Sequence, residues 1–523
     1  MKPKWFHGYY WLILLSLILY VPLVFLGGFG TSDDLSLVAH IGTDYWQDLK
    51  YSLSRSGHVS RPIYGLIQTT TLHLFGSSYV LYNIFRLSLW AALIITANLV
   101  FKKSLGSKKT LLFLFFLSFP IFASSQLFNT MQTGYILSII FFLLALRSTQ
   151  NQNRKGTFRF YFIYFSWSLL ALLSCEIVFP LFLFPLLQLW SNSKSIVRFR
   201  NILFTTGLVF IAVLILKFVI GPYYQIGEEI YGFSLSQHSI LQGFYYFFAM
   251  FIELPILLYE VIPFYVSEPL LWMSLLVFPL VYCSNLASNT KWDKRTFLHA
   301  LITIFACCFI FVLSNYPAVT YGLYNKMLLP SHLFMSLVLA LVCIWLLNSR
   351  FYLLSYVIAI LWFASMEMQV INTIRSWDKR TEVYEDLVPL LEKQNTLDYV
   401  FVEVPYFLTS NYNNEPVFSL FEDFQGGLIL NGYKGEAELI FPYTARMLED
   451  SLYWPNHNIV NVIREQEIDN FSCIYTSVAS SKYFDSIVDY NNDLAGFMAS
   501  DYFSTQIDCQ RARLRSWLSK NIK

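Results

Sequence analysis

The sequence predicts a polytopic α-helical membrane protein, with about 11 transmembrane helices and a small C-terminal α/β domain outside the membrane. Of its 523 residues, 56% are hydrophobic and only 13% are charged, whereas soluble domains contain about 25% charged residues. Charge also divides the chain. Residues 1–370 contain 23 Lys and Arg against 12 Asp and Glu, and residues 371–523 contain 13 against 22. We therefore expect a membrane domain over 1–370 and an acidic soluble domain over 371–523.

The apolar runs give the predicted crossings. Residues Tyr9–Gly30 are uncharged and too long for a signal-peptide core, so they predict an uncleaved first helix with a cytosolic N-terminus. The first outer loop, 31–78, is rich in Tyr and Trp, which predicts amphipathic helices at the level of the lipid headgroups. Further crossings are expected at 79–100, 110–125, 132–146, 160–175, 177–190, 201–220, 270–287, 297–314, 327–348 and 351–370.

The distribution of basic residues predicts which side of the membrane each loop faces. This arrangement places 17 Lys and Arg on the cytosolic face and four in the outer loops before the tail, as the positive-inside tendency requires. Residues 221–269 contain five Glu and no Lys or Arg. We place them outside, with 240–263 as a re-entrant or interfacial helix or as a pair of half-helices.

The acidic tail is predicted to mix helix and strand. Trp377–Lys393 has helical spacing, and Leu397–Val404, Gly427–Leu430 and Phe471–Tyr475 are typical of strands. Cys473 and Cys509 can pair if the tail faces an oxidising compartment, a question that the sequence leaves open. No basic patch lies on a soluble region, which argues against a nucleic-acid partner.

An acidic pair, Asp33–Asp34, follows directly on the first crossing. One interpretation is a helix cap, because carboxylates favour the positive end of a helix. The other is a catalytic base that takes a proton from an acceptor hydroxyl. Asp33, His40 and Asp44 also share one helical face if the helix continues through Gly42. Such a face can hold Mg²⁺ or Mn²⁺, although an isolated His beside Asp is more often only hydrogen-bonded.

Several polar residues are candidate ligands for a phosphate or a sugar. Arginine has a planar fork that suits phosphate oxygens, although an arginine at the interface can simply extend to the headgroups. Arg86 lies within a predicted crossing, where an ionisable group is costly and usually faces a partner or a cavity. A late outer loop combines aromatic, amide and ammonium groups, which equally suit an ordinary aromatic belt. The candidates are Arg61, Arg86, Glu176, Tyr321, Asn325 and Lys326.

The motifs Thr31-Ser32-Asp33-Asp34, Ser60-Arg61-Pro62, Arg86, Ser174-Cys175-Glu176 and Tyr321–Pro330, in a chain of this layout, resemble the GT-C superfamily of membrane glycosyltransferases. The likeness is to bacterial enzymes that use polyprenyl-phosphate sugars, including serotype-converting glucosyltransferases that modify O-antigen. Ser60 stands where relatives often have Gly, and Lys326 stands where an arginine is expected.

The resemblance implies a bacterial cytoplasmic-membrane enzyme with its site at the outer face. It would move a hexose from a polyprenyl-phosphate donor to a hydroxyl of a cell-surface glycan or glycolipid, with inversion. Asp33 or Asp34 would be the base, and Arg61, Arg86 and Lys326 would neutralise the leaving phosphate. The alternatives are a polymerase or ligase of lipid-linked polysaccharide, and a transporter or flippase, which would often show inverted repeats.

Overall fold

The computed structural model describes residues 6–30, 34–39, 41–54, 61–128, 133–150, 158–191, 196–224, 237–285, 293–314, 328–392, 399–403, 421–434, 439–443 and 471–475. The chain divides into two compact units. Unit 1 comprises residues 1–28 and 42–371, and unit 2 comprises 29–41 and 372–523. This division differs from the predicted one at residues 29–41, which group with the tail.

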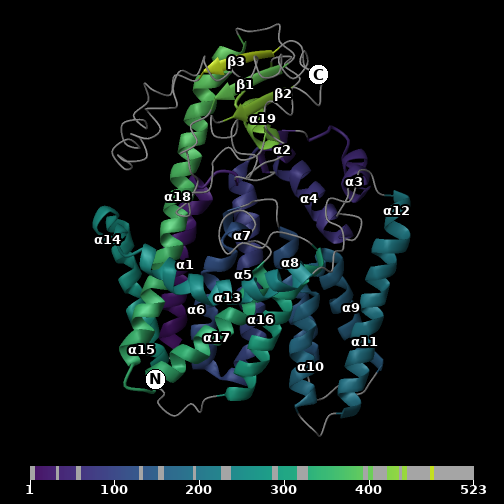
Figure 1. Cartoon of the computed structure of the whole chain (residues 1–523), viewed down its shortest axis with the longest axis vertical. Coiled ribbons are helices and arrows are strands. Elements are labelled where there is room, and N and C mark those ends of the chain that lie inside the picture. Colours follow the sequence, from purple (N-terminus) through teal and green to yellow (C-terminus); the bar gives the residue numbers. More distant parts are fainter. Residues whose placement is uncertain are drawn as a thin grey trace. The chain divides into compact units, whose positions relative to one another are not determined.

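The protein is an α-helical membrane protein. Six helices in the described residues are long and apolar enough to cross a membrane, lying within α1 (Phe6–Leu26), α5 (Tyr79–Leu105), α8 (Thr133–Gln150), α11 with its π-helical end η5 (Ile196–Ile220), α17 (Leu329–Leu347) and α18 (Tyr352–Glu392). Each one follows from a predicted apolar run. In Figure 1, α9, α10 and α11 run side by side in unit 1.

The other helices of unit 1 are shorter or less uniformly apolar. They are α3 (Tyr45–Ser54), α4 (Pro62–Phe75), α6 (Ser107–Ser118), η1 (Ile121–Ala123), α7 (Ser125–Phe128), α9 (Phe158–Ser174), η3 (Glu176–Phe182), α10 (Leu183–Trp190), α12 (Gly221–Tyr224), α13 (Gln237–Glu260), α14 (Phe264–Ser267), η6 (Pro269–Leu276), α15 (Val277–Asn285) and α16 (Lys294–Ser314). Helices α3 and α4 lie in the predicted first outer loop, where Trp46 is 73% exposed, as expected of a ring at a membrane interface.

The centre of unit 1 is formed by α6 and α17, which pack on each other and are almost entirely buried. Helix α6 has only 12 residues and ends inside the protein, so its last carbonyls need donors from other helices. The indole of Trp90 and the hydroxyl of Tyr20 donate to Ser118 O. Trp362 Nε1 donates to Phe119 O at 2.7 Å. The predicted crossing 110–125 is therefore a short helix followed by two single turns.

Helix α13 settles one of the alternatives for residues 240–263. It is one continuous helix of 24 residues with Pro255 inside it, so the pair of half-helices was wrong. Phe244 contacts the rings of Phe305 and Phe309 in α16, and Phe247 also contacts Phe305. These contacts fall within about one turn of α16.

Unit 2 contains the end of α18, helix α2 (Asp34–Ala39), helix α19 (Phe421–Leu430) and a parallel sheet of order β2-β1-β3. The strands are β1 (Tyr399–Glu403), β2 (Leu439–Tyr443) and β3 (Phe471–Tyr475), with Tyr399 paired to Leu439 and to Phe471. Strands β1 and β3 lie where the sequence predicts them. The strand predicted at 427–430 was wrong, because these residues complete α19.

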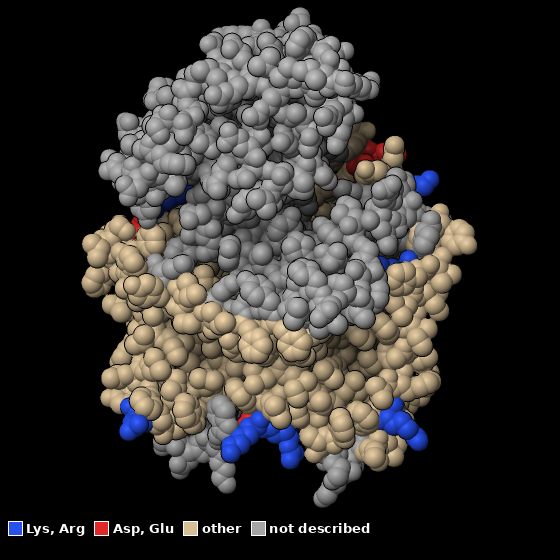
Figure 2. Space-filling view, viewed as in Figure 1, with Lys and Arg blue, Asp and Glu red and all other residues tan. Residues whose placement is uncertain are grey.

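Basic residues gather at one end of unit 1. Figure 2 shows three groups of Lys and Arg atoms along the lower edge of the described surface. Helix termini that carry these residue types include the end of α5 with Lys102 and Lys103, the end of α8 with Arg147, and the start of α16 with Lys294 and Arg295.

Candidate functional site

The strongest candidate site in unit 1 is an ion pair between Arg61 and Glu176. Arg61 Nε lies 2.5 Å from Glu176 Oε2, and Arg61 Nη2 lies 2.8 Å from Oε1. The pair is therefore bidentate, the geometry that a guanidinium makes with a carboxylate or a phosphate. Lys217 Nζ lies 3.8 Å from the same Oε1. Two cations share one carboxylate, so the cluster carries a net charge of +1.

Local structure explains why these side chains meet. Arg61 precedes Pro62, which occupies the first turn of α4, where its missing N–H costs nothing. Glu176 begins η3 directly after the extended residue Cys175. Lys217 lies in the π-helical end of α11, a form that frequently marks functional positions. The cluster thus joins three elements that are far apart in sequence.

The cluster is partly open. The side chains of Arg61, Glu176 and Lys217 are 19%, 24% and 35% exposed. Burial acts to lower the pKa of Arg61, but the Glu176 charge raises that pKa well above its usual value. Burial likewise acts to raise the pKa of Glu176, and Arg61 with Lys217 brings it down to about 2. The two cations therefore favour the ionised form of this carboxylate.

A close approach of α4 to α8 supports this arrangement. A Cβ on Gly134 would lie 2.3 Å from Tyr64 Cδ2, so only glycine lets the Tyr64 ring pack there. The neighbouring Tyr135 contacts the Tyr64 ring edge-on, with centroids 6.4 Å apart. Gly134 thus fixes the start of α4, and with it Arg61.

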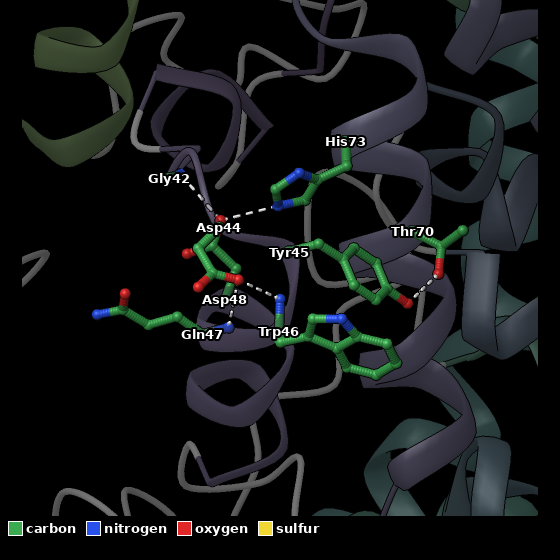
Figure 3. Close-up of polar contacts among 8 residues, drawn as sticks. All are labelled: Gly42, Asp44, Tyr45, Trp46, Gln47, Asp48, Thr70 and His73. Carbon is green, nitrogen blue, oxygen red and sulfur yellow. Dashed lines mark hydrogen bonds and ion pairs between the residues drawn. The ribbon is translucent and has the colours of Figure 1, made fainter.

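Helices α3 and α4 are held together by a second polar group (Figure 3). Asp48 Oδ2 accepts the Gly42 N–H at 2.9 Å and lies 2.9 Å from His73 Nε2. The hydroxyls of Tyr45 and Thr70 are hydrogen-bonded at 3.1 Å. The sequence reasoning missed this Asp–His pair, whose partners are 25 residues apart on two helices.

Arg86 has a different setting from Arg61. It is 1% exposed, and its Nη2 donates to Asn83 Oδ1 at 2.8 Å. Asn83 Nδ2 in turn lies 3.3 Å from Leu23 O and from Gly28 O, carbonyls in the last turn of α1 and just after it. Within the described residues, Arg86 makes no ion pair with Glu176. Its described contacts anchor α1 to α5.

Asp34, the described member of the acidic pair, lies in unit 2. It is the first residue of α2, it is fully buried, and its Oδ2 accepts the Gly30 N–H at 2.9 Å. Arg380 of α18, which the sequence reasoning missed, holds the same segment by donating to Gly30 O at 2.9 Å and to Phe29 O at 2.5 Å. The Phe29 ring also contacts Trp377 edge-on. These contacts explain why residues 29–41 belong to unit 2.

The prediction of a metal site assumed that one helix continues through Gly42. Residues 41–44 are not helical, so no helix continues through Gly42 to place Asp44 on the face predicted for Asp33 and His40. Asp44 instead caps α3, because its Oδ1 accepts the Trp46 N–H at 2.8 Å. Asp33 and His40 lie outside the described residues, and no group of three metal-binding side chains occurs within the described ones.

The late-loop candidates Tyr321, Asn325 and Lys326 lie outside the described residues, as does Ser60. Of the predicted site residues, the structure therefore brings Arg61 and Glu176 together and adds Lys217 to them. It gives Arg86 and Asp34 separate contacts. Comparisons with protein-family models, with curated proteins and with solved structures find no match for this chain.

Proposed function

We propose that this protein is an inverting glycosyltransferase that moves a hexose from a polyprenyl-phosphate donor to a hydroxyl of a cell-surface glycan or glycolipid. The observation that carries the proposal is the cluster of Arg61, Glu176 and Lys217, in which two cations share a single carboxylate. Its excess positive charge and partial exposure suit an anionic ligand. In a membrane protein, a lipid-linked phosphate reaches such a cluster without leaving the bilayer.

The chemistry needs a cation on the donor side. As the glycosidic C–O bond breaks, negative charge grows on the leaving polyprenyl phosphate, so a fixed guanidinium and ammonium bind the transition state more tightly than the ground state. In the proposal, the guanidinium group of Arg61 contacts both Glu176 and the phosphate, and Lys217 adds a second positive charge. Glu176 orients Arg61 and is not the proton carrier in this proposal, because both of its oxygens contact cations.

The acceptor side needs a base. The acceptor oxygen attacks the anomeric carbon as the phosphate leaves, and its proton passes to a carboxylate base. The resemblance to GT-C enzymes makes Asp33 and Asp34 the candidates for that base. This single displacement inverts the anomeric centre. Arg86 supports the membrane unit through Asn83, and Tyr321, Asn325 and Lys326 remain candidates for sugar or phosphate contacts. This displacement proceeds without a requirement for Mg²⁺ or Mn²⁺.

The proposal places the reaction at the outer face of a bacterial cytoplasmic membrane. The six long helices supply six crossings in this proposal, and five shorter segments supply the rest, which gives about 11. The five segments are α6 with its two following turns, α9, η3 with α10, η6 with α15, and α16. Lysines and arginines at the ends of α5 and α8 then face the cytosol. Helix α13 remains outside or re-entrant, and unit 2 forms an extracytoplasmic α/β domain.

Turnover by purified protein tests this proposal. The full chain in lipid nanodiscs is expected to transfer sugar from a polyprenyl-phosphate hexose, or to hydrolyse the donor slowly when no acceptor is present. Asp33→Asn or Asp34→Asn is expected to lower turnover at least about 100-fold, the usual contribution of a general base. Radiolabelled sugar in the lipid and aqueous fractions is the measurement.

The matched control is Asp378→Asn, which neutralises an exposed carboxylate on α18 and should leave turnover unchanged. Thermal unfolding of each variant separates a lost base from a lost fold, because Asp34 also accepts the Gly30 N–H. Full activity in both Asp33→Asn and Asp34→Asn would show that the pair is not the base.

A further inference from the structure

A cavity of about 400 Å³ lies at the basic end of unit 1, between α5, α8 and α9. Its basic and polar lining consists of Lys103, Arg147, Ser148 and Gln150, and its apolar lining consists of Leu99, Leu144, Phe160, Ile163 and Trp167. None of these residues belongs to the cluster of Arg61, Glu176 and Lys217. The cavity is therefore a separate feature of the membrane unit.

The lining changes from charged to apolar along α5 and α8, and α9 contributes apolar side chains only. On α5, Leu99 lies one turn before Lys103, and on α8, Leu144 lies one turn before Arg147. Helix α9 runs in the opposite sense, so Phe160 near its start is followed by Trp167 about two turns deeper. The gradient matches an amphiphile, with an anionic headgroup at the basic helix ends and hydrocarbon toward the middle of the helices.

Among the described residues, no acidic side chain forms an ion pair with the cations that line this cavity. Residues 49–175 contain 12 Lys and Arg but no Asp or Glu. Lys103 and Arg147 are exposed, and neither makes an ion pair among the described residues. Arg198 lies over the Phe160 ring, 5.6 Å from its centroid, so a third cation borders the cavity. A negative ligand is the natural partner of such a group.

The opening of the cavity points to a lipid rather than a soluble anion. Leu99 is 48% exposed and Ile95, one turn away on α5, is 61% exposed. Both lie in a helix apolar enough to span a membrane, so the cavity opens beside a surface that hydrocarbon covers. A volume of about 400 Å³ is at the small end of ligand pockets. It accommodates a headgroup and the first part of an acyl chain, with the remainder along α5.

We propose that this cavity binds one anionic glycerophospholipid, with its phosphate between Lys103 and Arg147 and an acyl chain against Leu99 and Leu144. Basic pockets between transmembrane helices bind anionic headgroups by this chemistry. The bound lipid joins α5, α8 and α9 at the end of the unit opposite to that assigned to catalysis. Its role is to stabilise the membrane unit, so it is independent of the proposed transferase activity.

Lipid titration of the delipidated full-length protein, followed by native mass spectrometry, tests the site. We expect phosphatidylglycerol to bind more tightly than phosphatidylcholine. Lys103→Gln with Arg147→Gln is expected to weaken phosphatidylglycerol binding about 30-fold, or about fivefold for each charge. Leu144→Trp, which fills the cavity and keeps both charges, should also abolish tight binding. Inorganic phosphate and glycerol 3-phosphate should not displace the lipid.

The matched control is Lys102→Gln with Arg159→Gln, which removes two positive charges from the end of α5 and the start of α9 without changing the lining. This variant should bind phosphatidylglycerol within about threefold of wild type. Equal losses in the two double variants would show only a general effect of surface charge. Unchanged binding in Leu144→Trp, or displacement of the lipid by inorganic phosphate, would equally overturn the proposal.

Discussion

Two arginines, Arg61 in unit 1 and Arg380 in unit 2, have opposite kinds of partner. Arg61 is paired with a carboxylate, is 19% exposed and has Lys217 nearby, so its cluster has positive charge in excess. Arg380 is 1% exposed and donates to two backbone carbonyls, Phe29 O and Gly30 O. A fully buried arginine that donates to backbone carbonyls stabilises the conformation of the backbone. A partly exposed arginine beside a second cation can bind an anionic ligand.

The comparison predicts the largest effect for Arg61, and that effect should be on activity. Arg61→Ala is expected to lower kcat/KM for a polyprenyl-phosphate sugar about 10²- to 10³-fold, because one charge-stabilising donor is lost at the leaving phosphate. Arg61→Lys should recover only part of this, since an ammonium cannot make the bidentate contact. Steady-state kinetics with the lipid donor measure both.

Unfolding should change little in Arg61→Ala, because Glu176 keeps Lys217 as a partner. Lys50→Gln is the control, since Lys50 is an exposed cation of the same outer loop and should retain wild-type kinetics. A large drop in unfolding temperature with unchanged kcat/KM would assign Arg61 to the fold and not to the phosphate.

Arg380 should show the reverse behaviour, a loss of stability. Arg380→Ala leaves the carbonyls of Phe29 and Gly30 buried without these donors, at a cost of about 1–3 kcal/mol for each group. We expect lower yield and a lower unfolding temperature in detergent. Arg375→Ala is the matched control, because Arg375 is exposed on the same helix. Wild-type stability in Arg380→Ala would remove the contrast between the two arginines.

The smallest expected effect concerns Gly134 of α8, which packs against the start of α4. Gly134→Ala places a methyl group 2.3 Å from Tyr64 Cδ2, so α4 must shift, at a cost of about 1–3 kcal/mol. We expect a modest fall in unfolding temperature and a several-fold rise in KM for the donor. Gly207→Ala is the control, because a Cβ at Gly207 meets no atom within 4 Å. Equal effects of the two substitutions would show that Gly134 does not position Arg61.

Much of the membrane unit could be predicted from sequence, because long apolar runs have few alternatives to spanning a bilayer. Arg61 and Glu176 were recognisable as candidates, but not as partners. They are 115 residues apart, and no local pattern reports a contact between distant helices. Arg380 was missed because it stands in a polar stretch, Ser376-Trp377-Asp378-Lys379-Arg380, which is typical of a solvated helix surface.

The wrong strand at 427–430 has a physical explanation. Leu428-Ile429-Leu430 suits a strand by composition, but tertiary packing favours α19. A Cβ at Gly427 would lie 2.2 Å from Tyr384 Cζ, and α19 packs against α2. The metal hypothesis needed a helix through Gly42, whereas residues 41–44 are not helical and Asp48 Oδ2 accepts the Gly42 N–H.

The most direct test of the account is whether the purified, folded chain uses a lipid-linked donor through Arg61. We predict transfer of sugar from a polyprenyl-phosphate hexose, no transfer from a nucleotide hexose, and a loss of about 10²- to 10³-fold in Arg61→Ala. No turnover of lipid-linked donors by protein that unfolds cooperatively, or full turnover by Arg61→Ala, would contradict the central claim.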